Sequence, residues 1–421
     1  MARSARSPSY RRRVIVSVLM RQAVICNAVR TPVGRMGGVF RDLPAATFGA
    51  LVVRAVVDRS AIADEAVDDA ILGQGYPNGE VPSVGGVAAL DAGLPATVPG
   101  MQMDRRCGSG LQAVLQAAMQ VQTGVSYVVI VGGVKRMSQV EHYAPALRWG
   151  TRGEGVGLHD RLARARVTAG EIHQPVPGGM IETAKRLRAD YGNSREEEDT
   201  LAVESHRRAV SAQDAGRFAA EIVPVPVCTR SGTEMVDADE HPGETVLYRN
   251  WLGRAGRAMS SICRRRSRRA TALSSTTPAR LVSLPTRIVR RLLVCGHWLA
   301  WCRGRWSASS RAGWGLGPVP ATQAALGRAG LAMADMDLIE FNEALAAQVL
   351  ALTRDWRFGS HDFARMNVNG SGISLGHPFG ATGARMPATM LHEMDRLQAR
   401  YGLETMCIGG GQGRAAVFER I

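Results

Sequence analysis

The chain has 421 residues, which is long enough for two or more domains with a large core. Its 45% hydrophobic content and 47 glycines are ordinary for an α/β enzyme, and no uncharged apolar run reaches the roughly 18 residues of a membrane span. The net charge of +15 comes from residues 1–19, with five Arg, and residues 246–314, with fifteen. The remainder is mildly acidic, so we do not expect a nucleic-acid-binding protein. The lack of a long apolar run excludes a membrane-spanning protein from our expectations.

The seven cysteines are scattered, with no C-x-x-C pair and no tight Cys/His cluster. This pattern argues against a disulfide framework or a metal site and fits a reducing compartment, so we expect a cytoplasmic protein without a metal. Residues 1–19 are rich in Arg and Ser and precede a natural restart at Met20. We interpret these residues as the result of a start codon that was assigned too far upstream. The alternative is a mitochondrial transit peptide.

From Met20 onward, strand and helix patterns alternate. The predicted strands are 23–28, 68–72, 98–104 and 127–131, and helices are predicted at 48–57, at 85–93 and from 111 to the glycine at 124. This alternation implies a mostly parallel sheet with covering helices. The continuous apolar run at 127–131 predicts a strand that is buried on both faces.

Cys107 stands at the start of the third predicted helix, whose apolar face runs from Leu111 to Met119 and which Gly124 ends. The free backbone N–H groups and the dipole at a helix N-terminus favour a thiolate, which is how a reactive cysteine is built. The alternatives are a small buried cysteine, or a nucleotide loop. The loose Gly-x-Gly-x-x-Ala match lacks the acidic residue that a dinucleotide site carries about 20 positions later.

Residues 139–245 are polar and rich in loops, with one helix at 180–191 and another that begins at the Ser194–Glu197 capping box. We interpret them as an inserted excursion that covers a substrate. After residue 315 regular order returns, with strands at 337–341, 405–408 and 415–419 and helices at 345–353 and 384–399. Both halves place polar groups where a strand meets a glycine loop, which indicates an internal duplication.

Three reactive side chains occupy predicted loops: Cys107, His377 within Gly-His-Pro, and Cys407 before a glycine run. Seven stretches match the motifs of one family in their order along the chain and in their spacing: 28–34, 107–110, 131–133 with 137–138, 342–344, 367–370, 376–378 and 407–411. In these motifs, across residues 20–245 and 315–421, the sequence resembles the thiolases.

The resemblance implies an α/β fold, namely a duplicated thiolase fold of two similar mixed five-stranded sheets with covering helices. It assigns residues 20–138 to an N-terminal half, 315–421 to a C-terminal half, and 139–245 to a loop domain that contacts coenzyme A. It also implies a homodimer or homotetramer. Coenzyme A thioesters, acetyl-CoA and acyl-CoA, would be substrates, with no permanently bound cofactor.

The family's catalytic roles carry over one residue at a time. Cys107 would take the acyl group, His377 would receive its proton, and Cys407 would remove or return the α-proton of acetyl-CoA. One oxyanion would be stabilised by His377 with a water held by Asn342, and the other by the backbone N–H groups of Cys107 and Gly409. The expected reaction condenses acetyl-CoA with acyl-CoA or cleaves 3-ketoacyl-CoA by thiolysis.

The sequence departs from the family at a few positions. Lys135 and Arg136 stand where the family usually has Glu-Ser, a charge reversal near the sheet that we expect to cost stability, and Leu345 replaces a common Phe. Arg105 and Arg106, directly before the nucleophile, either favour its thiolate further or are solvated or paired.

Residues 246–314 carry no thiolase motif, although the segment keeps about the family's length. Five of the seven Trp and three of the seven Cys lie there. Codons that encode residues 267–280 can also encode a segment that thiolases carry there, if they are read in the frame that starts at each third base. We therefore interpret 246–314 as a frameshifted segment that replaces the end of the N-terminal half and the start of the C-terminal half. The alternative function is therefore a catalytically impaired thiolase-like protein. A basic nucleic-acid-binding insert is disfavoured.

Overall fold

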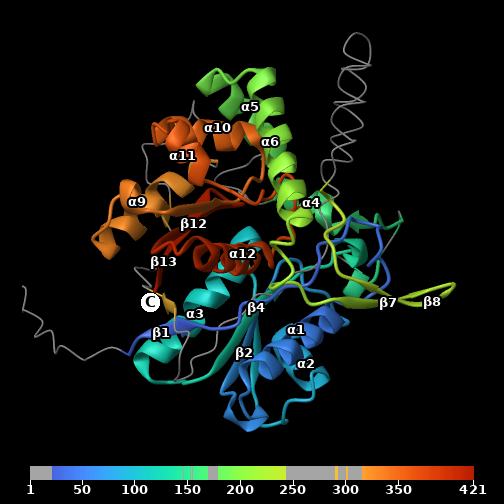
Figure 1. Ribbon diagram of the computed structural model, residues 1–421. Coiled ribbons are helices and arrows are strands. Elements are labelled where there is room, and N and C mark those ends of the chain that lie inside the picture. Colours follow the sequence, from blue (N-terminus) through green and yellow to red (C-terminus); the bar gives the residue numbers. More distant parts are fainter. Residues whose placement is uncertain are drawn as a thin grey trace, which may run out of the picture.

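The computed structural model describes residues 21–145, 147–151, 153, 155–168, 179–242, 290–292, 300–301 and 315–421. The predicted upstream extension at 1–19 and nearly all of the predicted frameshifted segment at 246–314 lie outside the described residues. Helices lie on the outer faces of two sheets and also between them (Figure 1). Among the described residues, no helix is both long and apolar enough to cross a membrane.

The first sheet is parallel, with the strand order β3-β2-β4. Its strands are β2 (Asp69–Gln74), β3 (Gly100–Met103) and β4 (Val129–Val134). Successive residues of β2 face opposite sides, so Ala70 and Leu72 enter one apolar cluster and Ile71 enters another. Helices α1 (Ala45–Ser60) and α2 (Val84–Asp91) cover the first of these faces. The prediction of a strand buried on both faces at 127–131 is confirmed in β4, because Val129 and Val131 enter the cluster of Ile71 and Ile130 enters the other.

The layer between the sheets is formed by α3 (Ser109–Thr123) and α12 (Thr382–Leu397) (Figure 1). Leu111 and Leu115 of α3 share one buried cluster with Ala388 of α12 and with residues of both sheets. As predicted, α3 ends at Gly124, which has the left-handed φ of 77°. The start of α3 and the start of α12 follow the two motifs that contain Cys107 and His377.

The second sheet is mixed, with the order β1-β9-β13-β12-β11 and with β10 also paired to β13. Its strands are β1 (Ala23–Ile25), β9 (Arg290–Leu292), β10 (Ala300–Trp301), β11 (Leu338–Phe341), β12 (Tyr401–Ile408) and β13 (Gln412–Arg420). Only β11 and β12 pair in parallel. The predicted mixed sheet is confirmed here, because a glycine turn with φ of 101° at Gly410 returns β13 directly against β12. The mostly parallel sheet predicted from the strands at 23–131 holds for β2, β3 and β4, whereas β1 pairs with β9 in the second sheet. The described residues supply three strands to one sheet and six to the other.

The outer face of the second sheet is covered by α9 (Pro318–Ala329), α10 (Ala346–Asp355) and α11 (Ser360–Arg365) (Figure 1). Phe341 of β11, Leu403 of β12 and Val417 of β13 pack there against Val349 and Leu352 of α10. Strands β11, β12 and β13 are thus buried on both faces, which fixes the ends of β11 and β12 where polar side chains follow.

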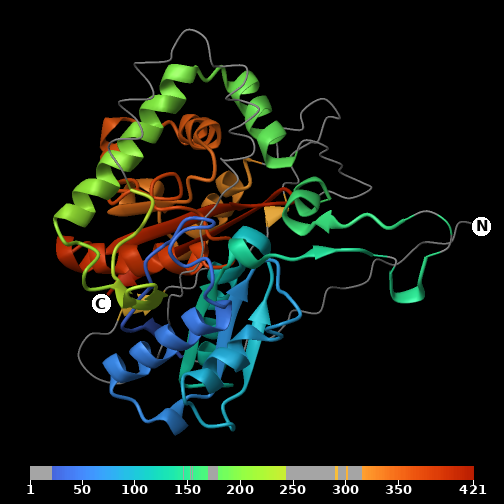
Figure 2. The ribbon, with the colours of Figure 1, turned by 90° about the vertical axis from the view of Figure 1, so that its right-hand side faces the viewer.

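The next elements lie within residues 139–245, which we interpret from the sequence as an inserted excursion. Its elements are β5 (His142–Tyr143), β6 (His159–Asp160), α4 (Arg161–Val167), α5 (Gly179–Tyr191), α6 (Arg195–Asp214), β7 (Val225–Thr229) and β8 (Gly232–Val236). The predicted capping box is confirmed, because Ser194 Oγ accepts from the Glu197 N–H at 3.1 Å and the Glu197 carboxylate accepts from the Ser194 N–H at 2.7 Å. Figure 2 shows α5 and α6 along the second sheet and a teal segment near residues 140–160 that extends from the body.

A buried ion cluster ties the excursion to the start of the chain. Arg30 Nε lies 2.6 Å from Glu221 Oε1, and Arg30 Nη1 lies 2.7 Å from Asp239 Oδ1. Burial alone would lower the pKa of Arg30, but the carboxylates of Asp239 and Glu221 outweigh it and raise that pKa. The guanidinium is therefore charged and fully paired inside the protein.

Candidate active site

Cys107 lies in the 3-10 turn Arg106–Gly108 that leads directly into α3, at the position predicted from the sequence. The turn is held by Ser109, whose Oγ accepts from the Arg105 N–H at 2.7 Å and donates to the Arg106 carbonyl at 2.7 Å. As a residue, Cys107 is half-buried.

Burial raises the pKa of the Cys107 thiol, although a hydrogen bond from the backbone N–H of Gly409 and the charge of Arg106 act in the opposite direction. The sequence predicted a thiolate here from the helix N-terminus alone. That prediction is wrong for the resting site, because desolvation by the surrounding protein exceeds the stabilising contacts. A neutral thiol needs a base before it can act as a nucleophile.

His377 is buried in the loop that precedes α12. Its Nδ1 lies 2.7 Å from Thr382 Oγ1, and this hydroxyl donates to the Pro378 carbonyl at 3.0 Å. Because the hydroxyl proton is used there, Thr382 accepts from Nδ1–H, and we assign the tautomer with an unprotonated Nε2 from this network. The amide nitrogen of Asn342 lies 3.3 Å from that Nε2, as a donor would.

The imidazole of His377 is neutral at physiological pH. Burial, followed by the nearby charge of Arg385, lowers its pKa to about 3. A neutral ring with a free Nε2 lone pair can accept a proton, and once protonated it can donate a hydrogen bond to a developing negative charge.

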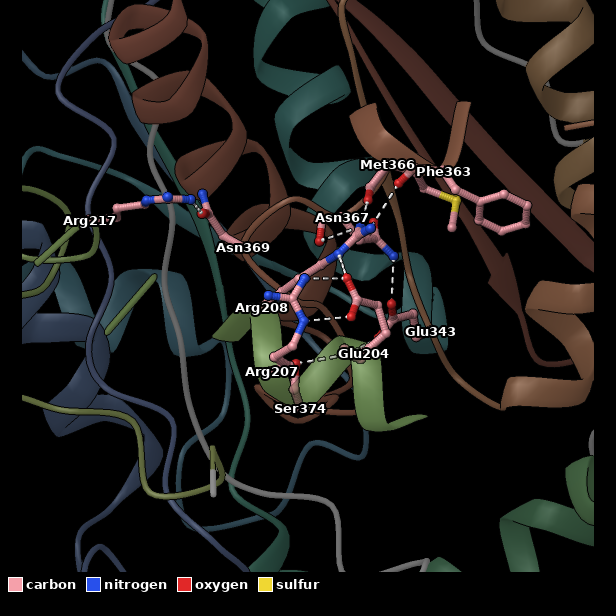
Figure 3. Close-up of polar contacts among 11 residues, drawn as sticks. Glu204, Arg207, Arg208, Arg217, Glu343, Phe363, Met366, Asn367, Asn369 and Ser374 are labelled. Carbon is pink, nitrogen blue, oxygen red and sulfur yellow. Dashed lines mark hydrogen bonds and ion pairs between the residues drawn. The ribbon is translucent and has the colours of Figure 1, made fainter. Parts of the chain in front are cut away.

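Asn342 follows β11 directly, and its backbone N–H donates to the Thr405 carbonyl of β12 at 3.1 Å. The preceding Phe341 is clamped by Asn367, whose side chain accepts from the Phe341 N–H at 2.7 Å and donates to its carbonyl at 2.9 Å. Asn367 also donates to Glu343 at 2.8 Å (Figure 3). The orientation of Asn342 therefore depends on Asn367.

Arg208 of α6 supports the same loop from outside. Its guanidinium donates to the carbonyl oxygens of Phe363 and Met366, while Glu204 holds it from the same helix at 2.7 Å (Figure 3). These contacts connect the excursion to the segment that contains Asn367. The position of α6 therefore influences the site indirectly.

Cys407 lies near the end of β12 and is buried. Its Sγ donates to Gln348 Oε1 at 3.3 Å, and Gln348 in turn donates to the Gly315 carbonyl at 2.7 Å. Burial and then the charge of Cys107 raise the pKa of Cys407 to about 12. The two thiols are therefore close enough to influence each other. The expected roles require this, because Cys107 would carry the acyl group and Cys407 would transfer a proton to or from the same substrate.

The loop of His377 reaches the first sheet because β4 has a glycine at the contact. A Cβ at Gly133 would overlap the carbonyl oxygen of Gly380, which is in the His377 loop. The close approach seats that loop on the edge of β4 next to α3. Cys107 and His377 are thereby brought to one site from opposite ends of the chain.

The structure places Cys107 beside Gly409 and Cys407, and His377 beside Asn342. The backbone of Asn342 bonds to Thr405, two residues before Cys407, which connects the two groups through β11 and β12. Sequence reasoning missed the supporting side chains Thr382 and Gln348, and it placed Asn367 in a motif without giving it a role. A threonine four residues after a proline at a helix start is a weak signal for Thr382, whereas nothing in the sequence marked Gln348.

Lys135 and Arg136, which depart from the family pattern, are both buried. Lys135 Nζ donates to the Gly75 carbonyl at 2.7 Å and lies 4.7 Å from the centre of the Tyr76 ring. Burial lowers the pKa of Lys135 to about 7 and that of Arg136 to about 10. Among the described residues, no hydrogen-bond partner meets the Arg136 guanidinium. The expected stability cost of this pair stays a prediction.

A cavity of about 610 Å³ lies beside these groups and is a reasonable size for a substrate. It is lined by Gly75, Tyr76, Asp104, Arg105, Arg106, Arg161, Ala165, Ile408 and Gln412. Arg161 and Ala165 belong to α4, so the excursion supplies one wall.

Comparison with known proteins agrees with this geometry. The family description "Thiolase, N-terminal domain" matches residues 23–249, and "Thiolase, C-terminal domain" matches residues 301–420. Beta-ketothiolase BktB of Cupriavidus necator is 39% identical over 414 residues, covering 96% of this chain and 100% of the relative. An acetyl-CoA acetyltransferase of Pseudomonas aeruginosa is 38% identical over 410 residues, covering 95% and 100%.

Solved structures give the same result. The crystal structure of the Bacillus anthracis acetyl-CoA acetyltransferase superposes with a TM-score of 0.83 at 32% identity, covering 96% of this chain and 99% of that one. The two family descriptions together span most of the described residues. The chain belongs to the thiolase family, as its motifs, its fold and these relatives agree.

Proposed function

We propose that this chain, an acyltransferase of the thiolase type, exchanges acyl groups between acetyl-CoA, acyl-CoA and 3-ketoacyl-CoA through an acyl-enzyme on Cys107. The relatives named beta-ketothiolase and acetyl-CoA acetyltransferase support these substrates. One observation carries the assignment of residues. The backbone N–H of Gly409 donates to the sulfur of Cys107, and Cys407 lies two residues before Gly409, near the end of β12. The expected nucleophile, an oxyanion donor and a second thiol thus lie beside one another.

The cleavage direction begins with proton transfer from the Cys107 thiol to Nε2 of His377. The Cys107 sulfur attacks the 3-keto carbon of the substrate, and the bond between its second and third carbons breaks. The second carbon takes the proton of Cys407, so acetyl-CoA leaves and an acyl thioester remains on Cys107. The neutral state of His377 and the protonated state of Cys407 support these starting roles.

The second half-reaction restores the enzyme. The Cys407 thiolate takes the proton of incoming coenzyme A, whose sulfur attacks the Cys107 thioester. Acyl-CoA leaves, and the proton on His377 returns to Cys107. Exchange of one thioester for another is nearly isoenergetic, so the reverse condensation uses the same groups. The reaction needs no redox step.

Two oxyanions form on this path, and we assign donors to both. The Gly409 N–H, which already bonds the Cys107 sulfur, supports one donor site with the Cys107 N–H. Protonated His377 supports the other, with Asn342 at 3.3 Å from the ring nitrogen. A water held by Asn342 remains part of this proposal.

Three further expectations belong to the proposal. Residues 139–245 contact coenzyme A, supported by the cavity wall that α4 contributes. The chain assembles as a homodimer or homotetramer, supported by β3, whose second edge has no partner strand among the described residues. The protein is cytoplasmic and needs no permanently bound cofactor.

The test is thiolysis of acetoacetyl-CoA by the purified chain, followed by disappearance of the substrate. We expect turnover in the unmodified chain, loss of turnover in Cys107→Ser, and an acetyl adduct on the Cys107 peptide after incubation with acetyl-CoA. Cys228→Ser is the matched control, because Cys228 is exposed on β7 outside the site. An adduct on another cysteine would contradict the proposed nucleophile.

The rival hypothesis is a catalytically impaired chain. It rests on residues 246–314, which lie almost entirely outside the described residues, and neither the described site nor the relatives support it. A folded protein without turnover and without an adduct would favour it. The gene sequence around codons 240–316 tests the frameshift separately.

A further inference from the structure

The cavity beside the two thiols has an unusual lining for a site that handles acyl chains. Arg106 and Ile408 line the cavity and are the chain neighbours of Cys107 and Cys407, and the Ile408 side chain packs against Gly108. Tyr76 also lines it; its ring centre lies 5.6 Å from that of Phe379, whose ring centre is 5.2 Å from that of His377. The cavity therefore lies beside the segments that carry the two thiols and His377.

The cavity carries more positive than negative charge. Arg105, Arg106 and Arg161 line it, against the single carboxylate of Asp104. Arg161 pairs with Glu141 at 2.8 Å. Within the part of the chain that the structure describes, the guanidinium groups of Arg105 and Arg106 make no ion pair.

The partners of the two unpaired guanidinium groups are neutral. Arg105 donates to the side-chain oxygen of Gln112, and Arg106 donates to the Ala165 carbonyl at 3.3 Å. Asp104 accepts from the backbone N–H of Arg106 at 2.8 Å. Both guanidinium groups therefore retain donors and charge for an acidic ligand.

Building on the proposed function, we propose that the cavity selects acyl chains that end in a carboxylate, so that the preferred substrate is an ω-carboxy-3-oxoacyl-CoA. A neutral chain would displace water from the guanidinium groups and return no hydrogen bond. A terminal carboxylate gives charge-assisted bonds to them, and Arg presents a fork that fits a carboxylate. The side chains of Ile408 and Tyr76 provide apolar surface for the intervening methylenes.

The phosphates of coenzyme A are a second source of negative charge that the same arginines could bind. The two sources differ in where the charge is attached. A carboxylate belongs to the acyl group and persists when the nucleotide is removed. Acyl-pantetheine thioesters lack the phosphates and therefore separate the two sources.

The test compares 3-oxohexanedioyl-CoA with 3-oxohexanoyl-CoA, which differ by a carboxylate in place of a terminal methyl. We expect kcat/KM for thiolysis to be at least about tenfold higher for the dicarboxylic substrate, the equivalent of one charge-assisted contact. Arg105→Leu and Arg106→Leu should each lower this ratio severalfold, with partial rescue in Arg106→Lys. Arg164→Leu is the control, because Arg164 is an exposed arginine of α4 and does not line the cavity.

The outcomes are distinguishable. A ratio near one in the unmodified chain, or an equal fall of the ratio in Arg164→Leu, overturns the proposal. A preference that disappears with the matching pantetheine thioesters also overturns it and assigns the arginines to the coenzyme phosphates. A preference that persists with them supports the acyl carboxylate.

A readout without turnover separates this proposal from the proposed function. Calorimetry on Cys107→Ala with succinyl-CoA and butyryl-CoA, the acyl-CoA products of those two substrates, measures selectivity directly. If acetoacetyl-CoA is not cleaved but succinyl-CoA binds at least about tenfold more tightly, the proposed function fails and the selectivity stands. Equal affinities overturn the selectivity, whatever the activity.

Discussion

The hydrogen bond between His377 and Thr382 allows a quantitative test of the active site. Thr382→Val keeps the shape of the side chain and removes the hydroxyl that accepts from Nδ1–H at 2.7 Å. Both residues are buried, so water does not replace the lost partner. A buried donor without a partner costs about 1–3 kcal/mol, which corresponds to a loss of roughly 5- to 150-fold in rate.

The loss should fall on kcat rather than on KM. The acceptor at Thr382 fixes the tautomer that leaves Nε2 free, and its bond strengthens when the ring takes the proton of Cys107. Steady-state thiolysis of acetoacetyl-CoA gives both constants. Thr382→Ser restores the acceptor and should recover most of the rate.

Two controls isolate the effect. Thr389→Val removes another buried hydroxyl of α12, which bonds to Glu221 at 3.1 Å and lies outside the site, so kcat should not change. In a His377→Gln background, Thr382→Val should have little further effect because the two residues act together. A kcat in Thr382→Val equal to that of the unmodified chain would refute the reasoning, and so would additive losses in the double variant.

Two further predictions concern stability and are read from urea unfolding. Arg30→Met leaves the buried carboxylates of Glu221 and Asp239 without their cation and should cost about 3–5 kcal/mol. Arg54→Met, which breaks half-exposed pairs, should cost at most ~1 kcal/mol, and equal losses would contradict the argument from burial. Lys135 has a folded-state pKa of about 7 against an ordinary 10.5, so the unfolded chain binds more protons between these values and stability should rise with pH there by up to ~1.4 kcal/mol per unit. Lys135→Met should remove that rise and be the more stable protein at neutral pH and below; an unchanged pH slope would count against it.

Local patterns predicted most of the elements that position the site. The apolar spacing from Leu111 onward and Gly124 predicted α3, and the side chains of Ser194 and Glu197 predicted the start of α6. These signals lie within a few residues of the structures they specify. The motif that contains Cys407 likewise predicted a strand that breaks into a glycine turn.

What the sequence could not predict depends on contacts between distant segments. The pKa of Cys107 rises because the protein around it excludes water, and no local pattern reports that burial. The sequence placed the charge of Lys135 near the sheet but gave no partner for it, and Lys135 is buried against Gly75, 60 residues away. The pairing of β1 with β9, which places the first strand of the chain in the second sheet, depends on segments more than 260 residues apart.

The central layer of helices has a consequence for how activity responds to damage. Cys107 enters the site from the start of α3, while His377 enters from the start of α12, and both helices are held by one shared apolar cluster. A small slip between these helices would separate nucleophile and base while leaving each sheet with its own outer cover. Turnover is thus a more sensitive reporter of the docking of α3 on α12 than helix content or compactness would be. Loss of activity should precede the loss of secondary structure as the protein is heated or titrated with denaturant.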